Sequence, residues 1–478
     1  MSIFHSTPPY IIKSVSQRGT VSGITDAQNA TSVKENGTAR TCELAKPGGE
    51  RVNVGKILLM TTATIFEKGC GSMSQVFLKK IKIGKVRHLQ NIEIPLSETE
   101  RKHLILTGKN GSGKTSVINI LVDFFNYIVS NAFLSRESIL NKISTLKELI
   151  SHAIEKRDSR VLDDVQHTLA TNEHYLTFWD NASGECDYYA LREKYKNGDF
   201  IISTYKANRL YKNEVSNSIE KISLSDIYSI KSHPGTSLVK YMVAKKATQA
   251  FAQQKGDLAK SQEIEGWFFR FESILKKIFD DKDLKLDFNI ETFEFSILQT
   301  GHEPFDFNTM SDGYSAVFDI INDLIIRTEK KGTTVEGIVL IDEIEAHLHL
   351  ELQKSILPFL TGMFPNIQFI VTTHSPFILN SINNAVIFDL ENETLVKDGM
   401  GNLPYEGIVE GYFGADRLSQ ELRTKFERYK ELSAKEDPTD EDFAEMGELE
   451  IYLEEIPDYL AIGIASEYRR LRLENENK

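Results

Sequence analysis

The sequence GKNGSGKT at residues 108–115 decides how this chain is interpreted. Glycines at these spacings let successive backbone N–H groups turn toward phosphate oxygens, while the lysine reaches the β- and γ-phosphates. The apolar run at 104–106 predicts a strand before the loop, and residues 116–127 predict a helix whose N-terminus favours an anion. A chance glycine-rich turn would need neither flank, so we expect a P-loop that binds ATP and Mg²⁺. The residues expected at the nucleotide are Gly108, Lys109, Asn110, Gly111, Ser112, Gly113, Lys114, Thr115 and Ser116.

A second acidic motif lies more than two hundred residues downstream. The run GIVLI at 337–341 predicts a strand buried on both faces, and Asp342 and Glu343 follow it directly. We expect Asp342 to hold Mg²⁺ together with the Thr115 hydroxyl, and Glu343 to polarise the attacking water as a catalytic residue. Two acidic residues at a strand end can also form a plain turn, but the upstream P-loop favours the Walker B interpretation.

A histidine completes the set of expected catalytic residues. Residues 368–373 predict another buried strand, and His374 follows it in the sequence TTHSP. Ligands gather at the carboxyl ends of parallel strands, so His374 is expected to donate to the γ-phosphate. A structural histidine at a strand end is the alternative.

Composition limits the class of protein. The chain has 478 residues, 41% hydrophobic and 26% charged, enough for a large core and two or three structural units. No apolar run approaches the roughly 20 residues of a membrane span. Three cysteines without CxxC spacing favour a reducing cytoplasm and support no zinc site. A net charge of −13 argues against a surface covered with basic residues, although a local basic groove could still contact DNA.

The pattern along the chain predicts the domain organisation. Residues 1–72 are rich in polar residues without periodicity, so they are expected to be disordered or to be a mistranslated leader before Met73. The expected parts are an ATPase head at 73–127 and 200–390, a helical insertion at 128–199, a helical segment within the head at 244–280, and a helical C-terminal region at 391–478.

Individual elements can also be predicted. Apolar and polar residues alternate over 76–86 and 89–95, which predicts an antiparallel pair of strands. A further strand is predicted at 200–203 and a hairpin at 284–297. Helical spacing predicts one long amphipathic helix at 249–279 and C-terminal helices at 418–435, 443–455 and 458–473.

A signature-like segment stands before the acidic motif. Residues 310–314 read MSDGY and lead into a predicted helix at 315–327, where a serine N-cap would be the ordinary explanation. In this order, GKNGSGKT, SDGY, GIVLIDE, EAHLH and TTHSP resemble the ABC-type ATPase heads of SMC, RecF and OLD-like proteins, over roughly residues 75–390. Within that group the chain is similar to bacterial ATP-binding proteins such as the ATPases of Septu-type and retron anti-phage defence systems.

The resemblance implies a fold and a mechanism. The fold would be the α/β ABC head of a P-loop NTPase, with an antiparallel β subdomain, a helical insertion and a helical C-terminal tail. Two chains would pair head to tail, so that ATP held by Lys114 and Thr115 of one is capped by Ser311 and Gly313 of the other. ATP hydrolysis in this homodimer or higher oligomer would then control a separate effector protein, with a nuclease as one candidate, in anti-phage defence.

Other functions stay open. One is a RecF- or SMC-like DNA-binding ATPase in repair or chromosome maintenance, although long SMC arms need far more heptads than residues 128–310 can supply. Another is a scaffold that binds ATP and hardly hydrolyses it. The sequence IVEG at 408–411 resembles the opening of a TOPRIM nuclease, but residues 412–478 lack the later strand with its aspartate pair, so no fused nuclease is expected.

The chain also departs from the family pattern. Asp312 stands at the position of the family's second signature glycine. Ile344 stands where a proline usually follows the Walker B glutamate, and His349 stands at the position of the D-loop aspartate. No glutamine follows residues 200–203 at the expected Q-loop, where residues 205–209 stand instead. These departures affect the coupling between nucleotide and partner more than ATP binding.

Overall fold

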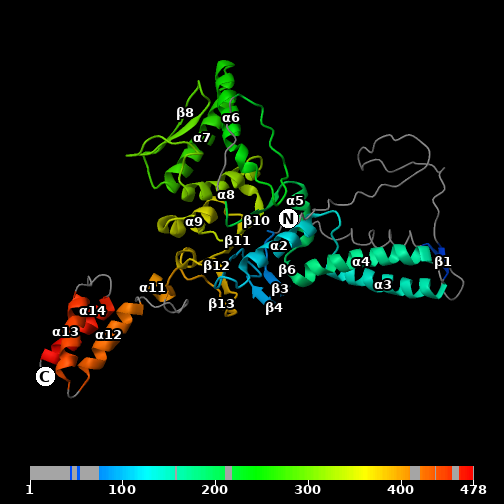
Figure 1. Cartoon of the computed structure of the whole chain (residues 1–478). Helices are drawn as coiled ribbons and strands as arrows, with labels where there is room; N and C mark the ends of the chain where they lie inside the picture. The colour runs from blue at the N-terminus through cyan, green and yellow to red at the C-terminus, as the bar shows by residue number, and fades with distance from the viewer. Residues whose placement is uncertain are drawn as a thin grey trace, which may run out of the picture. The chain divides into compact units, whose positions relative to one another are not determined.

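The computed structural model describes residues 43–45, 51–53, 75–156, 159–209, 218–409, 420–435, 438–454 and 462–476 (Figure 1). The chain divides into two units, Met1–Ser74 and Gln75–Lys478. In the first unit, β1 (Glu43–Ala45) pairs antiparallel with β2 (Arg51–Asn53), within the stretch expected to be disordered. The rest of that stretch up to residue 74 lies outside the described residues.

A six-stranded sheet forms the centre of the second unit, in the order β13-β12-β5-β11-β10-β7. Its strands are β5 (His103–Thr107), β7 (Phe200–Tyr205), β10 (Glu336–Ile341), β11 (Ile367–Thr372), β12 (Ala385–Asp389) and β13 (Thr394–Val396). The first five are parallel, and β13 pairs antiparallel at the edge. The strands predicted from apolar runs are confirmed. β12 and β13 were not predicted, and β13 lies in the region expected to be helical.

Both faces of this sheet are buried, because alternate residues of each strand enter different hydrophobic clusters. Val339 and Ile341 pack on one face with the helices α8 (Asp312–Thr328) and α9 (Leu350–Met363). Ile338 and Leu340 pack on the other face with α2 (Lys114–Val129). A continuous apolar run such as GIVLI is typical of this arrangement. The predicted α/β P-loop fold is confirmed.

A smaller antiparallel sheet has the order β4-β3-β6, with β3 (Lys80–Val86), β4 (Leu89–Pro95) and β6 (Ala182–Glu185). The predicted pair of strands is confirmed. The segment expected to be a helical insertion contains α3 (Arg136–Lys156), α4 (Ser159–Asn181) and α5 (Tyr188–Lys196), but it also supplies β6 to this sheet. The end of α4 comes so close to β3 that a Cβ atom at Gly84 would lie 1.9 Å from the Asp180 carbonyl oxygen.

The single helix predicted at 249–279 is wrong, because two helices occupy this region. These are α6 (Leu238–Gln254) and α7 (Leu258–Ile278). Gly256 between them has φ +75°, and the Asp257 side chain accepts a hydrogen bond from the Lys260 N–H, which starts a new helix. The predicted hairpin is confirmed as β8 (Lys285–Phe288) and β9 (Phe295–Leu298).

The remaining helices are short or C-terminal. The short ones are η1 (Pro234–Ser237), η2 (Gly332–Thr334), α10 (Pro376–Leu379) and α11 (Tyr405–Gly407). The C-terminal ones are α12 (Gln420–Ser433), α13 (Asp440–Glu454) and α14 (Ile462–Glu476), which share their own apolar cluster. The three predicted C-terminal helices are confirmed, while part of IVEG lies outside the described residues. None of the helices described has the length and apolarity to span a membrane.

Candidate active site

The P-loop has the backbone that its glycines predict. Gly108, Gly111 and Gly113 adopt φ values of +128°, +88° and +100°, which side chains strongly disfavour. Gly108 also has no room for a side chain, because a Cβ atom there would lie 2.9 Å from the Ser112 Oγ. Gly113 is the N-cap of α2, so the N–H groups of the loop lie next to the positive end of the helix dipole. Both favour a bound phosphate.

Lys114 lies buried within the turn of its own loop. Its Nζ donates to the carbonyl oxygens of Gly108 at 2.7 Å and Lys109 at 3.1 Å, and lies 3.5 Å from His374 Nδ1. Burial lowers the pKa of Lys114, and the nearby carboxylates of Glu343, Glu345 and Asp342 oppose that shift. The structure therefore brings together the lysine and the histidine that were predicted to reach the same phosphate. Lys109 differs, because its exposed side chain pairs with Glu391 at 2.9 Å.

The predicted metal ligands also meet. Thr115 Oγ1 lies 3.2 Å from Asp342 Oδ1, which also accepts a 2.7 Å hydrogen bond from Thr372 Oγ1. A hydroxyl and a carboxylate oxygen at this spacing fit Mg²⁺, which keeps most of its remaining ligands as water and phosphate oxygens. Thr115 and Asp342 are therefore the candidate protein donors. No cluster of three or more His, Cys, Asp or Glu suited to a metal occurs among the described residues.

The turn after β10 has an unusual backbone. Glu343 has φ +47°, which is uncommon for a residue other than glycine. Its N–H donates to Thr372 Oγ1 at 2.7 Å, so β11 holds this turn from one side. Glu343 is half-buried, which leaves its carboxylate accessible to water beside the buried Asp342. The arrangement suits a general base next to a cation.

Sequence analysis missed Arg209, which holds the same turn from the other side. Its guanidinium is buried and donates to the carbonyl oxygens of Asp342 at 3.0 Å, Glu343 at 3.2 Å and Ile344 at 2.7 Å. Burial lowers the pKa of Arg209 to about 10, although nearby acids such as Asp319 raise it. The only sequence signal was its place after β7, where a Q-loop glutamine was sought.

The signature-like residues sit at the start of α8. Ser311 is the exposed N-cap residue, but its side chain makes no capping hydrogen bond. Gly313 is buried, and a Cβ atom there would lie 2.9 Å from the His347 carbonyl oxygen, in the segment that follows the Walker B turn. Gly313 therefore lets α8 begin against that segment. The capping of a second chain's ATP by Ser311 and Gly313 stays a prediction.

Two curated proteins are similar to part of this chain. The chain is 24% identical over 403 residues to the Septu protein PtuA of Bacillus mycoides (strain KBAB4), covering 79% of this chain and 50% of that protein. It is 27% identical over 216 residues to the "Retron Vc95 probable ATPase" of Vibrio cholerae serotype O1 biovar El Tor, covering 44% and 39%. The chain thus spans about half or less of these relatives.

Solved structures give weaker similarity. The SMC head bound to the C-winged helix domain of ScpA aligns with a TM-score of 0.33 and 13% identity, covering 66% of this chain and 94% of that one. A nucleotide-free ATP-binding cassette from an ABC transporter aligns with a TM-score of 0.30 and 12% identity, covering 68% and 92%.

One family model matches a segment that contains the residues of the candidate site from Gly108 to His374. Glu391, the partner of Lys109, lies outside the matched segment. The family model is described as "AAA domain, putative AbiEii toxin, Type IV TA system", and it matches residues 104–380 of the 478. Because this match covers more than half of the chain, the protein belongs to that family of AAA domains.

Proposed function

We propose that this protein is a cytoplasmic ATPase that hydrolyses ATP to ADP and phosphate, and that its ATP-dependent assembly controls a partner effector in anti-phage defence. The observation that carries the proposal is the meeting of Lys114, Thr115, Asp342, Glu343 and His374 at the carboxyl edge of one parallel sheet. Ligands of open α/β sheets gather at this edge.

Each side chain then has a role that its position supports. Lys114, with the glycine N–H groups, binds the β- and γ-phosphates, and His374 donates to the γ-phosphate. Thr115 and Asp342 would hold Mg²⁺, which neutralises charge on the phosphates when bound. Glu343 orients a water and accepts its proton. Arg209 and Thr372 position the turn that carries Glu343.

The assembly part of the proposal depends on α8. Ser311 is exposed at the helix N-terminus with its hydroxyl free of a capping bond, so it can meet a phosphate bound to another copy. ATP would then stabilise a pair of chains with two composite sites, and hydrolysis would release it.

The defence part depends on the relatives. Two of them carry the names of a Septu protein and of a retron "probable ATPase". We propose that this chain likewise acts with a separate effector, for which a nuclease is the candidate. The alternative is a protein that contacts DNA and acts in repair. An ATPase activity that DNA stimulates without any effector would favour this alternative.

Replacing Glu343 by Gln tests the proposal. We expect ATP affinity to be retained and ATP turnover to fall by about 10²- to 10⁴-fold, because the amide cannot accept the proton of the attacking water. The trapped ATP should shift the protein to a dimer or larger assembly, measured by size-exclusion chromatography with light scattering. The control is Glu351→Gln, which changes an exposed glutamate that pairs with Lys354 on α9.

The two parts of the proposal can fail separately. Unchanged turnover in Glu343→Gln would reject the role of Glu343. Lost turnover with the same elution profile with and without ATP would keep the ATPase and reject ATP-dependent assembly.

A further inference from the structure

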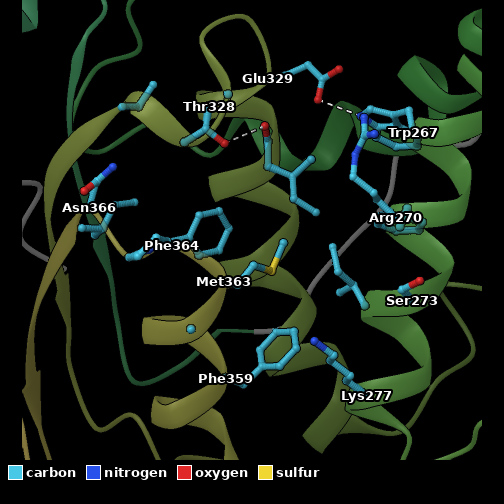
Figure 2. Close-up of a pocket in the computed structure, with 18 of the residues that line it drawn as sticks. Trp267, Arg270, Ser273, Lys277, Thr328, Glu329, Phe359, Met363, Phe364 and Asn366 are labelled. Atoms are coloured by element: carbon cyan, nitrogen blue, oxygen red, sulfur yellow. Dashed lines mark hydrogen bonds between the residues drawn. The ribbon is translucent and has the colours of Figure 1, made fainter. Parts of the chain in front are cut away.

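A groove lies between α7, α9 and the end of α8, and no role in the nucleotide site accounts for it. Its volume is about 860 Å³. Figure 2 shows Arg270, Ser273 and Lys277 of α7 facing Phe359 and Met363 of α9 across it. Ile274, Phe359 and Met363 are only half-buried, so the groove presents apolar surface to whatever enters it.

The groove is at the opposite edge of the sheet from the nucleotide. Val335, directly before β10, and Ile367, the first residue of β11, line it, whereas the P-loop follows the end of the parallel strand β5. Two helices connect these edges. α8 starts beside Ser311 and α9 starts after the Walker B turn, and residues at the end of each helix line the groove.

The rim of the groove carries two positively charged side chains. Arg270 and Lys277 are exposed, and neither has a carboxylate within ion-pair distance in the part of the chain that the structure describes. The groove's own acids are engaged elsewhere. Glu329 binds Lys245 at 3.0 Å and accepts from Trp267 Nε1 at 2.8 Å, and Glu263 pairs with Lys260 at 2.7 Å.

Helix α13 has the complementary surface. Phe443 and Ile451 are 58% and 64% exposed, and they lie on one side of the helix two turns apart. The acids Glu441 and Glu448 both lie along one side of this apolar seam and are also exposed, without an ion-pair partner among the described residues. The opposite side of α13 packs in the C-terminal cluster through Leu453. Within the described residues, α13 therefore keeps an exposed face that is both acidic and apolar.

The charges of the two surfaces have the same spacing. Arg270 and Lys277 are seven residues apart on α7, and Glu441 and Glu448 are seven residues apart on α13. Each pair therefore spans about 10 Å along a helix. Two helices lying side by side in the groove can form both ion pairs while Phe443 and Ile451 cover the apolar floor.

We propose that the groove binds the acidic face of α13 from a second copy of this chain. The contact needs no nucleotide, so it forms an interface distinct from the ATP-dependent one. A reciprocal exchange of two α13 helices closes a dimer, and ATP binding at the far edge of the sheet then joins such dimers into larger assemblies.

A charge swap tests the pairing directly. One protein carries Arg270→Glu with Lys277→Glu, and the other carries Glu441→Lys with Glu448→Lys. Both contain Lys114→Ala and are measured without nucleotide by sedimentation, so the outcome does not depend on the ATP site. The parent is the Lys114→Ala protein without charge reversals, and we expect it to self-associate at micromolar concentrations. Each charge-reversed protein should associate at least about tenfold more weakly. A mixture of the two should recover association, because the reversed charges on the two surfaces are again opposite.

Two further variants separate the contact from folding. Gly362 of α9 lines the groove, and a Cβ atom there meets nothing within 4 Å, so Gly362→Leu adds apolar bulk at the groove without a backbone conflict at Cβ and should weaken association. The control is Lys85→Glu with Lys221→Glu, both exposed and outside the groove, which should leave association unchanged. A monomeric parent, or a mixture that stays as weak as its components, would overturn the proposal.

Discussion

At the scale of residues, the decisive feature is the turn from Asp342 to Ile344. A glutamate with φ +47° stays in place only when its surroundings impose that conformation. Arg209 binds three successive carbonyl oxygens of this turn, and Thr372 binds the Glu343 N–H. The position of the Glu343 carboxylate therefore depends on the buried Arg209 guanidinium.

Replacing Arg209 by Lys should separate binding from turnover. A lysine keeps the charge but lacks the planar fork that reaches several carbonyl oxygens at once, so Glu343 should lose its alignment with the attacking water. We expect kcat for ATP to fall by about tenfold to a hundredfold, while ATP affinity changes by less than about threefold. Steady-state hydrolysis and fluorescent-nucleotide titration measure the two quantities.

The matched control is Arg136→Lys, because Arg136 is exposed and its side chain binds Asp180 alone among the described residues. An unchanged kcat in Arg209→Lys would show that Arg209 has no positioning role. A fall in affinity as large as the fall in kcat would instead indicate general damage to the site.

Most of the site could be predicted from sequence, and Arg209 shows why the rest could not. Lys114, Asp342 and His374 follow short apolar runs, so their places at strand ends can be predicted. The contact between Arg209 and Ile344 spans 135 residues and exists because β7 pairs with β10. A local sequence pattern does not predict the order of strands in a sheet. It therefore does not predict that Thr372 lies next to Asp342.

At the scale of elements, the strand β5 links the core to the P-loop. His103 begins β5 and is buried, and its Nδ1 accepts a 3.0 Å hydrogen bond from the Phe369 N–H of β11. This bond needs a neutral imidazole. Burial, aided by the nearby Arg101, lowers the pKa of His103 to about 4.

That shift predicts how stability depends on pH. The imidazole binds a proton near its ordinary pKa of 6.5 in the unfolded chain and only near 4 in the folded chain, so stability falls as pH drops between these values. The total loss amounts to about 3 kcal/mol at most. We expect His103→Asn to be less stable than the parent at pH 7.5 and to lose this part of the pH slope, measured by urea unfolding from pH 7.5 to 4.5.

The control for this experiment is His302→Asn, in an exposed turn after β9. Other groups titrate in the same range, so the difference in slope between variant and parent is the quantity that matters. Equal slopes for the parent and His103→Asn would contradict the assignment.

The elements that were predicted correctly share a strong local pattern. β10 and β11 are continuous apolar runs, and β3 and β4 alternate with period two. In contrast, β6 reads ASGE and gains its strand pairing only because β3 lies beside it. The break between α6 and α7 depends on Gly256 and Asp257, whose local effect was outweighed by the helical spacing on both sides.

At the scale of the whole molecule, the sequence predicts the P-loop fold but cannot show how copies meet. In the proposed composite site, each chain would supply only one of the two surfaces around the nucleotide. Lys114 lies on one element and Ser311 on another, and the family resemblance alone joins them across two chains. The groove at α7 and α9 was not predicted, since its lining residues come from α6, α7, α8 and α9 and from the segments that lead into β10 and β11.

Mixing two inactive proteins tests the composite site. Lys114→Ala removes the phosphate-binding ammonium, and Ser311→Arg blocks the exposed helix N-terminus without burying charge or removing a capping bond. In a mixed pair, the Lys114 of one chain faces the intact Ser311 of the other, so one of the two sites is whole. An equal mixture gives half mixed pairs, and we therefore expect about a quarter of the parent ATPase rate. If each chain instead completes its own site, the mixture will show only the sum of two inactive proteins.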